Sequence, residues 1–348
     1  MIDLSHTPYF LFGCGHRPKY LCLPGGLWAV ASGRFVVEFA PGSLSVDPPA
    51  YTVTAADLSG NEIHAFEDAT GLWLDRGRGK EPLSVGSVNL PAFEGHRHRD
   101  RLRILHHEIL TNIDDGLPLP NFLVYRKPWY RDAAMMAMVL EITDNVALLR
   151  DWILSLRDPY DRNNGGHEEP DNLGQVLYLV SLVDADAGAA ASHSVVESVL
   201  TAAERITEDG CLHGITDGRE HPVYQTKWLK FGLQKLGLPD PYRVPEVAES
   251  YGPLFWWDKR DVVVPTDRRY HEKAGLFPYL TWAEAHFHRD PTPLHYADEG
   301  YPITWESHAS QADYEGMRLV DPSFVDRRLS MPHTWHAAEM FLYLWEDR

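Results

Sequence analysis

The spacing of apolar and polar positions divides the chain into a β-patterned beginning and a helix-patterned remainder. Up to about residue 90, short β-branched and aromatic runs are separated by turn residues such as those at 24–26 and 41–42. Short runs bounded by Pro and Gly are typical of strands joined by tight turns. We therefore predict a small antiparallel β-rich region, with strands at Phe10–Phe12, Tyr20–Leu23, Leu27–Val30, Arg34–Phe39, Tyr51–Thr54 and Gly71–Leu74.

The stretch Tyr125–Ile142 has the pattern of a buried helix with a polar beginning. Charged and aromatic residues crowd its first part, and the apolar run Ala133–Leu140 follows with little polar face of its own. A helix that is apolar on nearly every side is buried, whereas guanidinium and carboxylate groups need partners or water. We predict an inner helix of a helical barrel whose N-terminal end opens into a polar pocket.

Five more segments repeat this pattern of a polar or aromatic beginning, followed in most of them by apolar residues. They recur at roughly 30- to 50-residue intervals, which fits one inner helix and one outer helix for each hairpin. Amphipathic outer helices are expected between them, for example at Asn145–Leu156 with Asp144 as its N-cap. The predicted inner segments are His167–Val183, His221–Leu236, Tyr270–Phe287, Tyr301–Met317 and Ser330–Trp345, and the outer ones include Arg103–Asn112, Ser194–Ile206 and Asp321–Arg328.

The predicted fold class is mainly α, an (α/α)6 toroid of helical hairpins with a small N-terminal antiparallel β-rich region. Residues 1–100 would form the β-rich region, and residues 101–348 would form the helical barrel that carries the catalytic site. A chain of 348 residues, 44% of them hydrophobic, is able to bury a core of that size.

Charge and composition narrow the expected partners and location. The formal net charge of −18 excludes nucleic acids and anionic membranes as expected partners, because both require a cationic surface. No apolar stretch is long enough to span a bilayer and no signal-like segment is present, so a cytoplasmic location is expected. The sequence indicates no oligomeric state.

No metal site and no cofactor is predicted from the sequence. Neighbouring histidines, His106–His107 and the pair His286 and His288, diverge in direction on a helix and so make poor joint ligands. Cys14 and Cys22 fit neither a disulfide framework nor a zinc set and are expected to be reduced, half-buried thiols.

Acidic residues concentrate where the predicted inner helices begin. Glu168, Glu169 and Asp171 fall within one short stretch, more than N-capping or the helix dipole requires, although each singly suits those roles. Glu306 stands beside Trp305, and an apolar ring next to a carboxylate shifts its acid strength or stacks on a sugar. These acids are the first candidates for proton-transfer chemistry.

Aromatic, basic and amide side chains accompany the acids, and such groups stack on sugar faces and bind hydroxyl groups. Arg131 and Asp132 also suit a local ion pair. The last inner segment opens with two imidazoles and an indole, where a Ser or Asp cap would suffice. The predicted substrate-binding residues are Trp129, Tyr130, Arg131, Asp132, Asp171, Gln225, Lys227, Trp305, His333, Trp335 and His336.

Two short motifs resemble those of a known family. The run at 129–134, WYRDAA, resembles the W-x-R-D-A signature of glucoamylase-like six-hairpin glycosidases, and the run at 331–338, MPHTWHAA, is similar to their P-x-T-W-S-x-A helix start, with His336 in place of the serine. The resemblance covers residues 125–345 and implies an (α/α)6 barrel that hydrolyses glycosides. It also implies that Arg131 and Asp132 bind hydroxyl groups of the terminal sugar.

The predicted function is a glycoside hydrolase that acts on a carbohydrate by acid/base catalysis. Inverting hydrolysis requires two carboxyl groups roughly 6.5–9.5 Å apart; Glu169, with Glu168 as its rival, is the predicted acid, and Glu306, with Glu272 in reserve, the predicted base. The basic candidates favour an acidic, uronate-containing substrate. Two alternatives remain: a non-catalytic sugar-binding module, or a polysaccharide lyase using Tyr130, Tyr224, His333 or His336.

Overall fold

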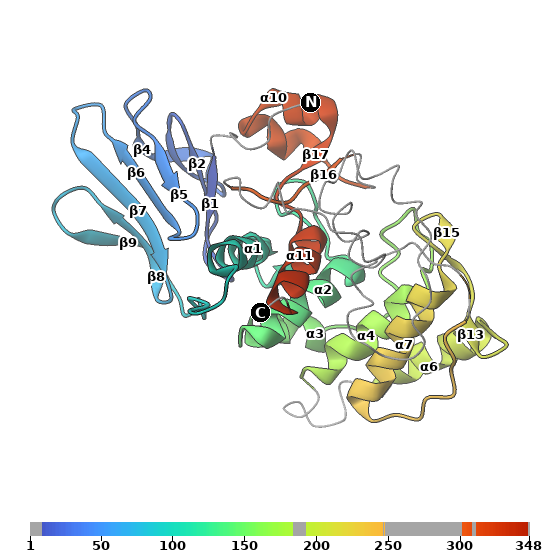
Figure 1. Cartoon of the computed structure of the whole chain (residues 1–348). Coiled ribbons are helices and arrows are strands. Elements are labelled where there is room, and N and C mark those ends of the chain that lie inside the picture. The colour runs from blue at the N-terminus through green and yellow to red at the C-terminus, as the bar shows by residue number, and fades with distance from the viewer. Residues whose placement is uncertain (1–8, 184–192, 246, 248–300, 308–310, 347–348) are drawn as a thin grey trace. The chain divides into compact units, whose positions relative to one another are not determined.

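The computed structural model describes residues 9–183, 193–245, 247, 301–307 and 311–346 (Figure 1). Contacts within the chain divide it into two compact units. Unit 1 comprises Met1–Arg126, Ile142–Leu148 and His295–Arg348, and unit 2 comprises Lys127–Glu141 and Leu149–Leu294. The predicted domain division at residue 100 stays a prediction.

Unit 1 begins with two antiparallel sheets in which each strand pairs with the next one along the chain (Figure 1). All six predicted strands overlap observed ones, so the predicted β-rich region is confirmed. The first sheet contains β1 (Phe10–Phe12), β2 (Tyr20–Leu23), β3 (Gly26–Ala29) and β4 (Arg34–Glu38). The second contains β5 (Ser45–Asp47), β6 (Thr52–Ala56), β7 (Glu62–Asp68), β8 (Gly71–Asp75) and β9 (Lys80–Val85).

Strands β5, β7 and β9 were not predicted, because polar residues interrupt their apolar pattern. In β7 the inward positions are Ile63, Ala65 and Glu67, which are all buried. A glutamate at an inward position breaks the alternation by which a half-buried strand is recognised.

Two helices of unit 1, α1 (Arg99–Thr111) and α11 (Thr334–Glu346), pack against each other. α1 is buried continuously from Ile104 to Thr111. It is therefore an internal helix and not the amphipathic outer helix predicted at 103–112. Its buried polar residues, among them His106, His107 and Glu108, gave it the appearance of having a solvated face.

The rest of unit 1 consists of short elements: β10 (Ile113–Asp114), β11 (Leu117–Pro118), β16 (Glu306–Ser307), β17 (Leu329–Ser330), the 3-10 helix η6 (Tyr314–Leu319) and α10 (Pro322–Arg327). The inner helix predicted at Tyr301–Met317 is wrong, because residue 306 starts a strand that pairs with β17. The helix predicted at Asp321–Arg328 is confirmed, and Asp321 caps it by accepting the Ser323 N–H at 2.8 Å.

Unit 2 contains the helices α2 (Tyr130–Ile142), α3 (Arg150–Leu154), α4 (Asp171–Ser181), α6 (His193–Arg205) and α7 (Pro222–Leu236), and the hairpins β12 (Thr207–Glu208) with β13 (Cys211–Leu212) and β14 (Ile215–Thr216) with β15 (Arg219–Glu220). α2 is buried from Tyr130 to Leu140. Burial of the apolar run Ala133–Leu140 was predicted, whereas the polar beginning of the helix was expected to open into a pocket and is buried as well. The helix predicted at 145–156 is broken into the 3-10 helix η2 (Val146–Leu149) and α3. Asp144 has a positive φ of 55° and is not its N-cap.

Helices α4 and α7 lie side by side (Figure 1) and approach each other through two glycines. A Cβ atom on Gly174 would overlap the backbone of Trp228 and Leu229, and one on Gly232 would overlap Leu177. Only glycine fits these two positions, so backbone meets backbone where the helices cross.

The predicted (α/α)6 toroid is wrong. A ring of six hairpins requires two helices for each hairpin, and the described ranges contain far too few helices for it. Residues 301–307 and 311–313 are not helical, and α11 belongs to a unit with two sheets. The segment Tyr270–Phe287 lies outside the described residues. The described chain is a mixed α/β protein. A polar beginning followed by an apolar run describes any buried helix and does not specify how helices stack. Among the described helices, none is both long and apolar enough to cross a lipid bilayer.

Candidate functional site

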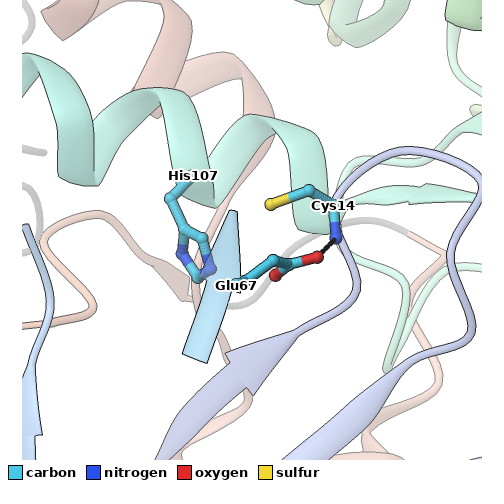
Figure 2. A group of neighbouring side chains, drawn as sticks. All are labelled: Cys14, Glu67 and His107. Carbon is cyan, nitrogen blue, oxygen red and sulfur yellow. Dashed lines mark hydrogen bonds between the residues drawn. The ribbon is translucent and has the colours of Figure 1, made fainter. Parts of the chain in front are cut away.

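In unit 1, Cys14, Glu67 and His107 come together from the loop after β1, from β7 and from α1 (Figure 2). Glu67 accepts hydrogen bonds from the backbone N–H groups of Gly13 at 3.1 Å and of Cys14 at 2.7 Å. It also forms an ion pair with Arg17, Nη1 to Oε1, at 2.9 Å. Both carboxylate oxygens are therefore engaged inside the protein.

Burial keeps the thiol and the imidazole of this group uncharged. It raises the pKa of Cys14 well above its ordinary value, which disfavours the thiolate that nucleophilic attack or metal binding requires. His107 is stacked between Phe10 and Tyr51, with ring centroids 4.7 and 4.8 Å away, and burial lowers its pKa to about 3. We assign this group to the core of unit 1, where it holds the loop to the sheet and the helix.

A second group, the Arg131 cluster, lies in unit 2. Arg131 donates from Nε to Asp171 Oδ2 at 2.9 Å and from Nη2 to Glu169 Oε2 at 3.2 Å. Asp171 also accepts hydrogen bonds from Gln175 at 2.9 Å and from Thr216 at 3.1 Å. Every side chain of the cluster is buried, and its members are Arg131, Glu169, Asp171, Gln175, Thr216 and Gln225.

Three helix beginnings and one hairpin bring these side chains together. Arg131 lies in the first turn of α2, Asp171 is the first residue of α4, and Gln225 lies in the first turn of α7. Thr216 ends β14 and accepts a hydrogen bond from Gln225 at 2.8 Å. Helix N-termini carry partial positive charge, so this is a favourable place for the carboxylates of the cluster.

Glu169 is held in a fixed position with a perturbed acidity. Its Oε1 accepts from the backbone N–H of Asp217 at 2.5 Å and from Asn164 at 3.2 Å. Burial raises the pKa of Glu169 above its ordinary value, Arg131 opposes this rise, and Asp171 adds to it. A carboxyl group that is both fixed and raised in pKa has the properties of a general acid.

Asp161 is a further acid near the beginning of α2, and it is half-buried. It accepts the backbone N–H of Tyr130 at 2.7 Å and that of Asn163 at 2.9 Å. Burial raises its pKa, and these backbone hydrogen bonds and Arg131 oppose the rise. Asp161 therefore caps α2 and adds another carboxyl group near Arg131.

The other predicted residues of unit 2 have different environments. Glu168, the rival acid, lies apart from the cluster and forms an ion pair with Arg162 at 2.7 Å, with its side chain 48% exposed. Asp171 was predicted to cap α4, but no side chain caps this helix and Pro170 occupies the N-cap position. The remaining predicted binding residues are all buried, namely Trp129, Tyr130, Asp132 and Lys227.

A third group, the imidazole cluster, lies in unit 1 and consists of Glu306, His333 and His336. Nε2 of His333 lies 2.7 Å from Oε2 of Glu306, and the two imidazole rings are 4.9 Å apart. Both imidazoles are 3% exposed, whereas the Glu306 side chain is 25% exposed. The ring of Trp335 stacks on that of His336 at 5.3 Å, and Trp305 is half-buried.

Unit 1 also contains a basic groove of about 720 Å³ that follows the charge run at residues 97–101. Arg99 pairs with Asp100 at 3.0 Å, and Arg97 donates to His98 at 3.1 Å. These charges are partly satisfied within the run itself, so we interpret the groove as a solvated, self-paired surface.

Sequence reasoning missed several members of the Arg131 cluster. Gln175 had a signal, because it is a polar residue within the apolar run of α4. Thr216 and Asp161 had none, since they lie in turn-rich segments where polar residues are ordinary. The reserve base Glu272 and its neighbours His271 and Lys273 lie outside the described residues.

Comparisons with family models, with curated proteins and with solved structures found no match. The predicted membership in the glucoamylase-like six-hairpin glycosidases is therefore wrong, in agreement with the shortage of helices. The two motifs that carried the resemblance are short, and here their residues belong to a buried ion network and to the imidazole cluster. The binding of sugar hydroxyl groups that the resemblance implied for Arg131 and Asp132 therefore has no family support, and any role for these residues must be argued from their contacts.

Proposed function

We propose that this protein is an enzyme that hydrolyses a glycosidic bond in a carbohydrate, with Glu169 donating a proton to the leaving oxygen while a water molecule supplies the hydroxyl group that bonds to the sugar carbon. The observation that supports this proposal is the environment of Glu169. It is a buried carboxyl group with a raised pKa, held between the Arg131 guanidinium and the Asp217 backbone N–H. Glycoside cleavage requires such a carboxylic acid, which must keep its proton until the leaving oxygen accepts it.

Asp171 supports this role by sharing Arg131. Nη2 of the guanidinium lies 3.2 Å from Glu169, while Nε makes the shorter bond to Asp171, at 2.9 Å. A guanidinium that is paired with a second carboxylate lowers the pKa of Glu169 less than an exclusive, bidentate pair would. Asp171 thus acts as a positioning residue, because it is 0% exposed and its oxygens are engaged.

The charge of the cluster bears on the substrate. Arg131 is shared between two carboxyl groups, so it offers little excess positive charge to an anionic sugar. Guanidinium and carboxyl groups in this arrangement suit the hydroxyl groups of a sugar ring. Comparison of a glucoside with the matching glucuronide tests the acidic substrate predicted from the sequence, and faster turnover of the glucuronide would support it.

A polysaccharide lyase is the second candidate, and two observations disfavour it. A lyase needs a free cation to neutralise the uronate and a base to remove the neighbouring proton. Arg131 is already paired, and burial raises the pKa of Tyr130, whose hydroxyl donates to the Asp158 carbonyl at 3.1 Å. Appearance of an unsaturated product that absorbs ultraviolet light would favour the lyase.

The experiment compares two adjacent glutamates in the full-length chain. Glu169→Gln keeps size and most hydrogen-bonding capacity but removes the proton donor. Glu168→Gln is the matched control, since its side chain is half-exposed and bonded to Arg162. Both variants and the parent chain are assayed on a panel of aryl glycosides, alkyl glycosides and glycuronides.

Glu169→Gln is expected to lower turnover of alkyl glycosides by about 10²- to 10⁴-fold, the usual contribution of a general acid. Activated aryl glycosides should lose much less, because their departing oxygen needs little protonation. Glu168→Gln should resemble the parent chain. Equal rates for Glu169→Gln and the parent on alkyl glycosides would refute the assignment. Binding of a sugar without turnover by the parent would indicate a non-catalytic module.

A further inference from the structure

We propose that Glu306, His333 and His336 form a binding site for one divalent transition-metal ion in unit 1. Their candidate ligand atoms, two imidazole nitrogens and a carboxylate oxygen, all lie within 4.8 Å of one another. The inference goes beyond the proposed glycosidic activity and does not depend on it. It also gives Glu306 a role other than the predicted base, because a metal-bound carboxylate is not free to activate water in that way.

The strand pair β16–β17 brings the carboxylate to the imidazoles. Glu306 pairs with Ser330 in this ladder, and the chain then runs through residues 331 and 332 to His333, immediately before α11. His333 and His336 stand three positions apart, which places their side chains on one face of the helix beginning. A residue far from them in sequence is thus held opposite both rings.

Hydrogen bonds fix the backbone around His333. Thr304 Oγ1 accepts the His333 N–H at 3.2 Å and donates to the buried carboxyl group of Glu108 at 2.6 Å. Asn121 donates to the Pro332 carbonyl at 2.6 Å, on the other side of His333. Ligands supported in this way are held in position before a metal binds, which reduces the cost of ordering them.

The ligand set and its exposure indicate the class of metal. Two imidazoles and one carboxylate suit Zn²⁺ and similar first-row ions, whereas Mg²⁺ and Ca²⁺ prefer oxygen ligands. Both rings are buried and the Glu306 side chain is 25% exposed, so the carboxylate side is open to solvent for entry of an ion and for bound water.

The three ligand atoms lie within 4.8 Å of one another, so the most distant of them must approach by up to roughly 1–2 Å when the ion binds. Zinc binds nitrogen and oxygen ligands at about 2.0–2.2 Å, so neighbouring ligand atoms lie roughly 3–3.6 Å apart. The 2.7 Å separation between His333 Nε2 and Glu306 Oε2 is that of a hydrogen bond and would open by less than about 1 Å. Coordination through Nε2 places the ring proton of His333 on Nδ1, so a neutral ring binds the ion without releasing a proton, whereas an imidazolium passes one proton to solvent.

The Cys14 group is the other candidate metal group in the described chain, and its carboxylate differs from that of the imidazole cluster in exposure and in partners. In the Cys14 group, Glu67 is already bonded to Arg17 and two backbone N–H groups, and its surroundings are closed to solvent. In the imidazole cluster, the carboxylate is partly exposed and faces two rings.

The experiment measures binding of Zn²⁺ to the full-length chain after chelator treatment, by calorimetry and by metal analysis after gel filtration. The parent chain is expected to retain about one equivalent of Zn²⁺, and Mg²⁺ should not compete. His336→Gln is expected to weaken binding by at least ~100-fold and Glu306→Gln by at least ~10-fold, since even outer-shell changes cost 10- to 100-fold.

His64→Gln is the matched control, because His64 and Glu62 form a surface imidazole–carboxylate pair at 3.0 Å outside the cluster. It should bind Zn²⁺ like the parent chain. Substitution with Co²⁺ gives a second readout, a visible spectrum that should change in both cluster variants. Because Glu306 is only half-buried, Glu306→Gln keeps the test valid if His336→Gln fails to fold.

The proposal is overturned if the parent chain binds Zn²⁺ no more tightly than Glu306→Gln, or if His64→Gln lowers the affinity as much as the cluster variants do. The cluster would then be a hydrogen-bonded His–Glu pair only. Normal Zn²⁺ binding by Glu169→Gln separates this result from the test of the glycosidic activity.

Discussion

The guanidinium of Arg131 bonds to the carboxylate of Asp171, Nε to Oδ2 at 2.9 Å, across a sequence separation of 40 residues. The two side chains are 6% and 0% exposed, so the pair is largely withdrawn from water. Removing one member of a buried ion pair leaves an uncompensated charge and costs roughly 3–5 kcal/mol. The pair therefore ties the beginnings of α2 and α4 together.

Arg131→Met is expected to lower the free energy of unfolding by roughly 3–5 kcal/mol near neutral pH. The loss should shrink at acidic pH, because burial raises the pKa of Glu169 and the unpaired carboxylate then takes up a proton in the folded state. Denaturant titrations at neutral and at acidic pH measure it. Arg150→Met is the control, since this arginine is 38% exposed and only 3.9 Å from Asp151. Equal losses in the two variants would contradict the prediction.

Gly174→Ala tests the crossing of α4 and α7. Alanine favours a helix by about 1 kcal/mol over glycine, but its Cβ would overlap the backbone of Trp228. Overpacking of this kind costs about 1–3 kcal/mol or more, so steric overlap should win and the melting temperature should fall. Gln234→Ala, at an exposed position of α7, should change little. A rise in the melting temperature of Gly174→Ala would show that the helices separate freely.

Glu339→Gln tests a buried acid of α11. Burial raises the pKa of Glu339 from its ordinary 4.5 to about 8. The folded state then binds this proton more tightly than the unfolded state, so the contribution to stability is full below about pH 4.5 and is lost as the pH rises to about 8. The variant should match the parent chain at the acid end and be more stable at alkaline pH, by at most about 5 kcal/mol.

Urea titrations across this pH window measure the difference between the two chains. Glu315→Gln is the control, because Glu315 is 70% exposed in its contact with Arg318. Parallel stability curves for Glu339→Gln and the parent chain would show that Glu339 ionises normally.

The cysteines supply a test that needs no substitution. Cys14, Cys22 and Cys211 are free and buried, whereas the sequence predicted reduced but only half-buried thiols for the first two. Burial raises the pKa of Cys22 to about 12, and thiols in this state react slowly. A thiol reagent should therefore label the folded chain slowly and all three cysteines rapidly in denaturant. Rapid labelling of the folded chain would contradict the burial.

The features predicted correctly from the sequence are those that depend on residues close together in the chain. Strands β1 to β4 were found because short apolar runs and the turn residues between them are neighbours in sequence. The start of α2 was predicted to be polar and its body buried, and both features follow from residues within one helix. Glu67 of β7 and Glu108 of α1 were not recognised as buried acids. Their partners, Arg17 and Thr304 respectively, are remote from them in sequence.

The sequence placed Asp171 correctly at the beginning of a helix but did not predict the partner of its carboxylate. Asp171 stands where an N-cap would, yet its carboxylate goes to Arg131, since a capping bond and an ion pair compete for the same oxygens. Glu306 was placed in a helix because acids are common in first turns, whereas its pairing with Ser330 determines its conformation. The toroid failed for a similar reason, because similar segments need not stack on one another.

Glu67 accepts hydrogen bonds from the backbone N–H groups of Gly13 and of Cys14, the second of which Figure 2 shows. These bonds give the loop the dynamic behaviour of a sheet. These two amides lie outside any ladder, yet they are released only when the buried carboxylate of β7 moves away from Arg17. Their hydrogen exchange should therefore be slow and proceed by cooperative opening, not by local fluctuation of the loop. Since the loop joins strands of the first sheet and Glu67 belongs to the second, the two sheets should open as a single cooperative unit.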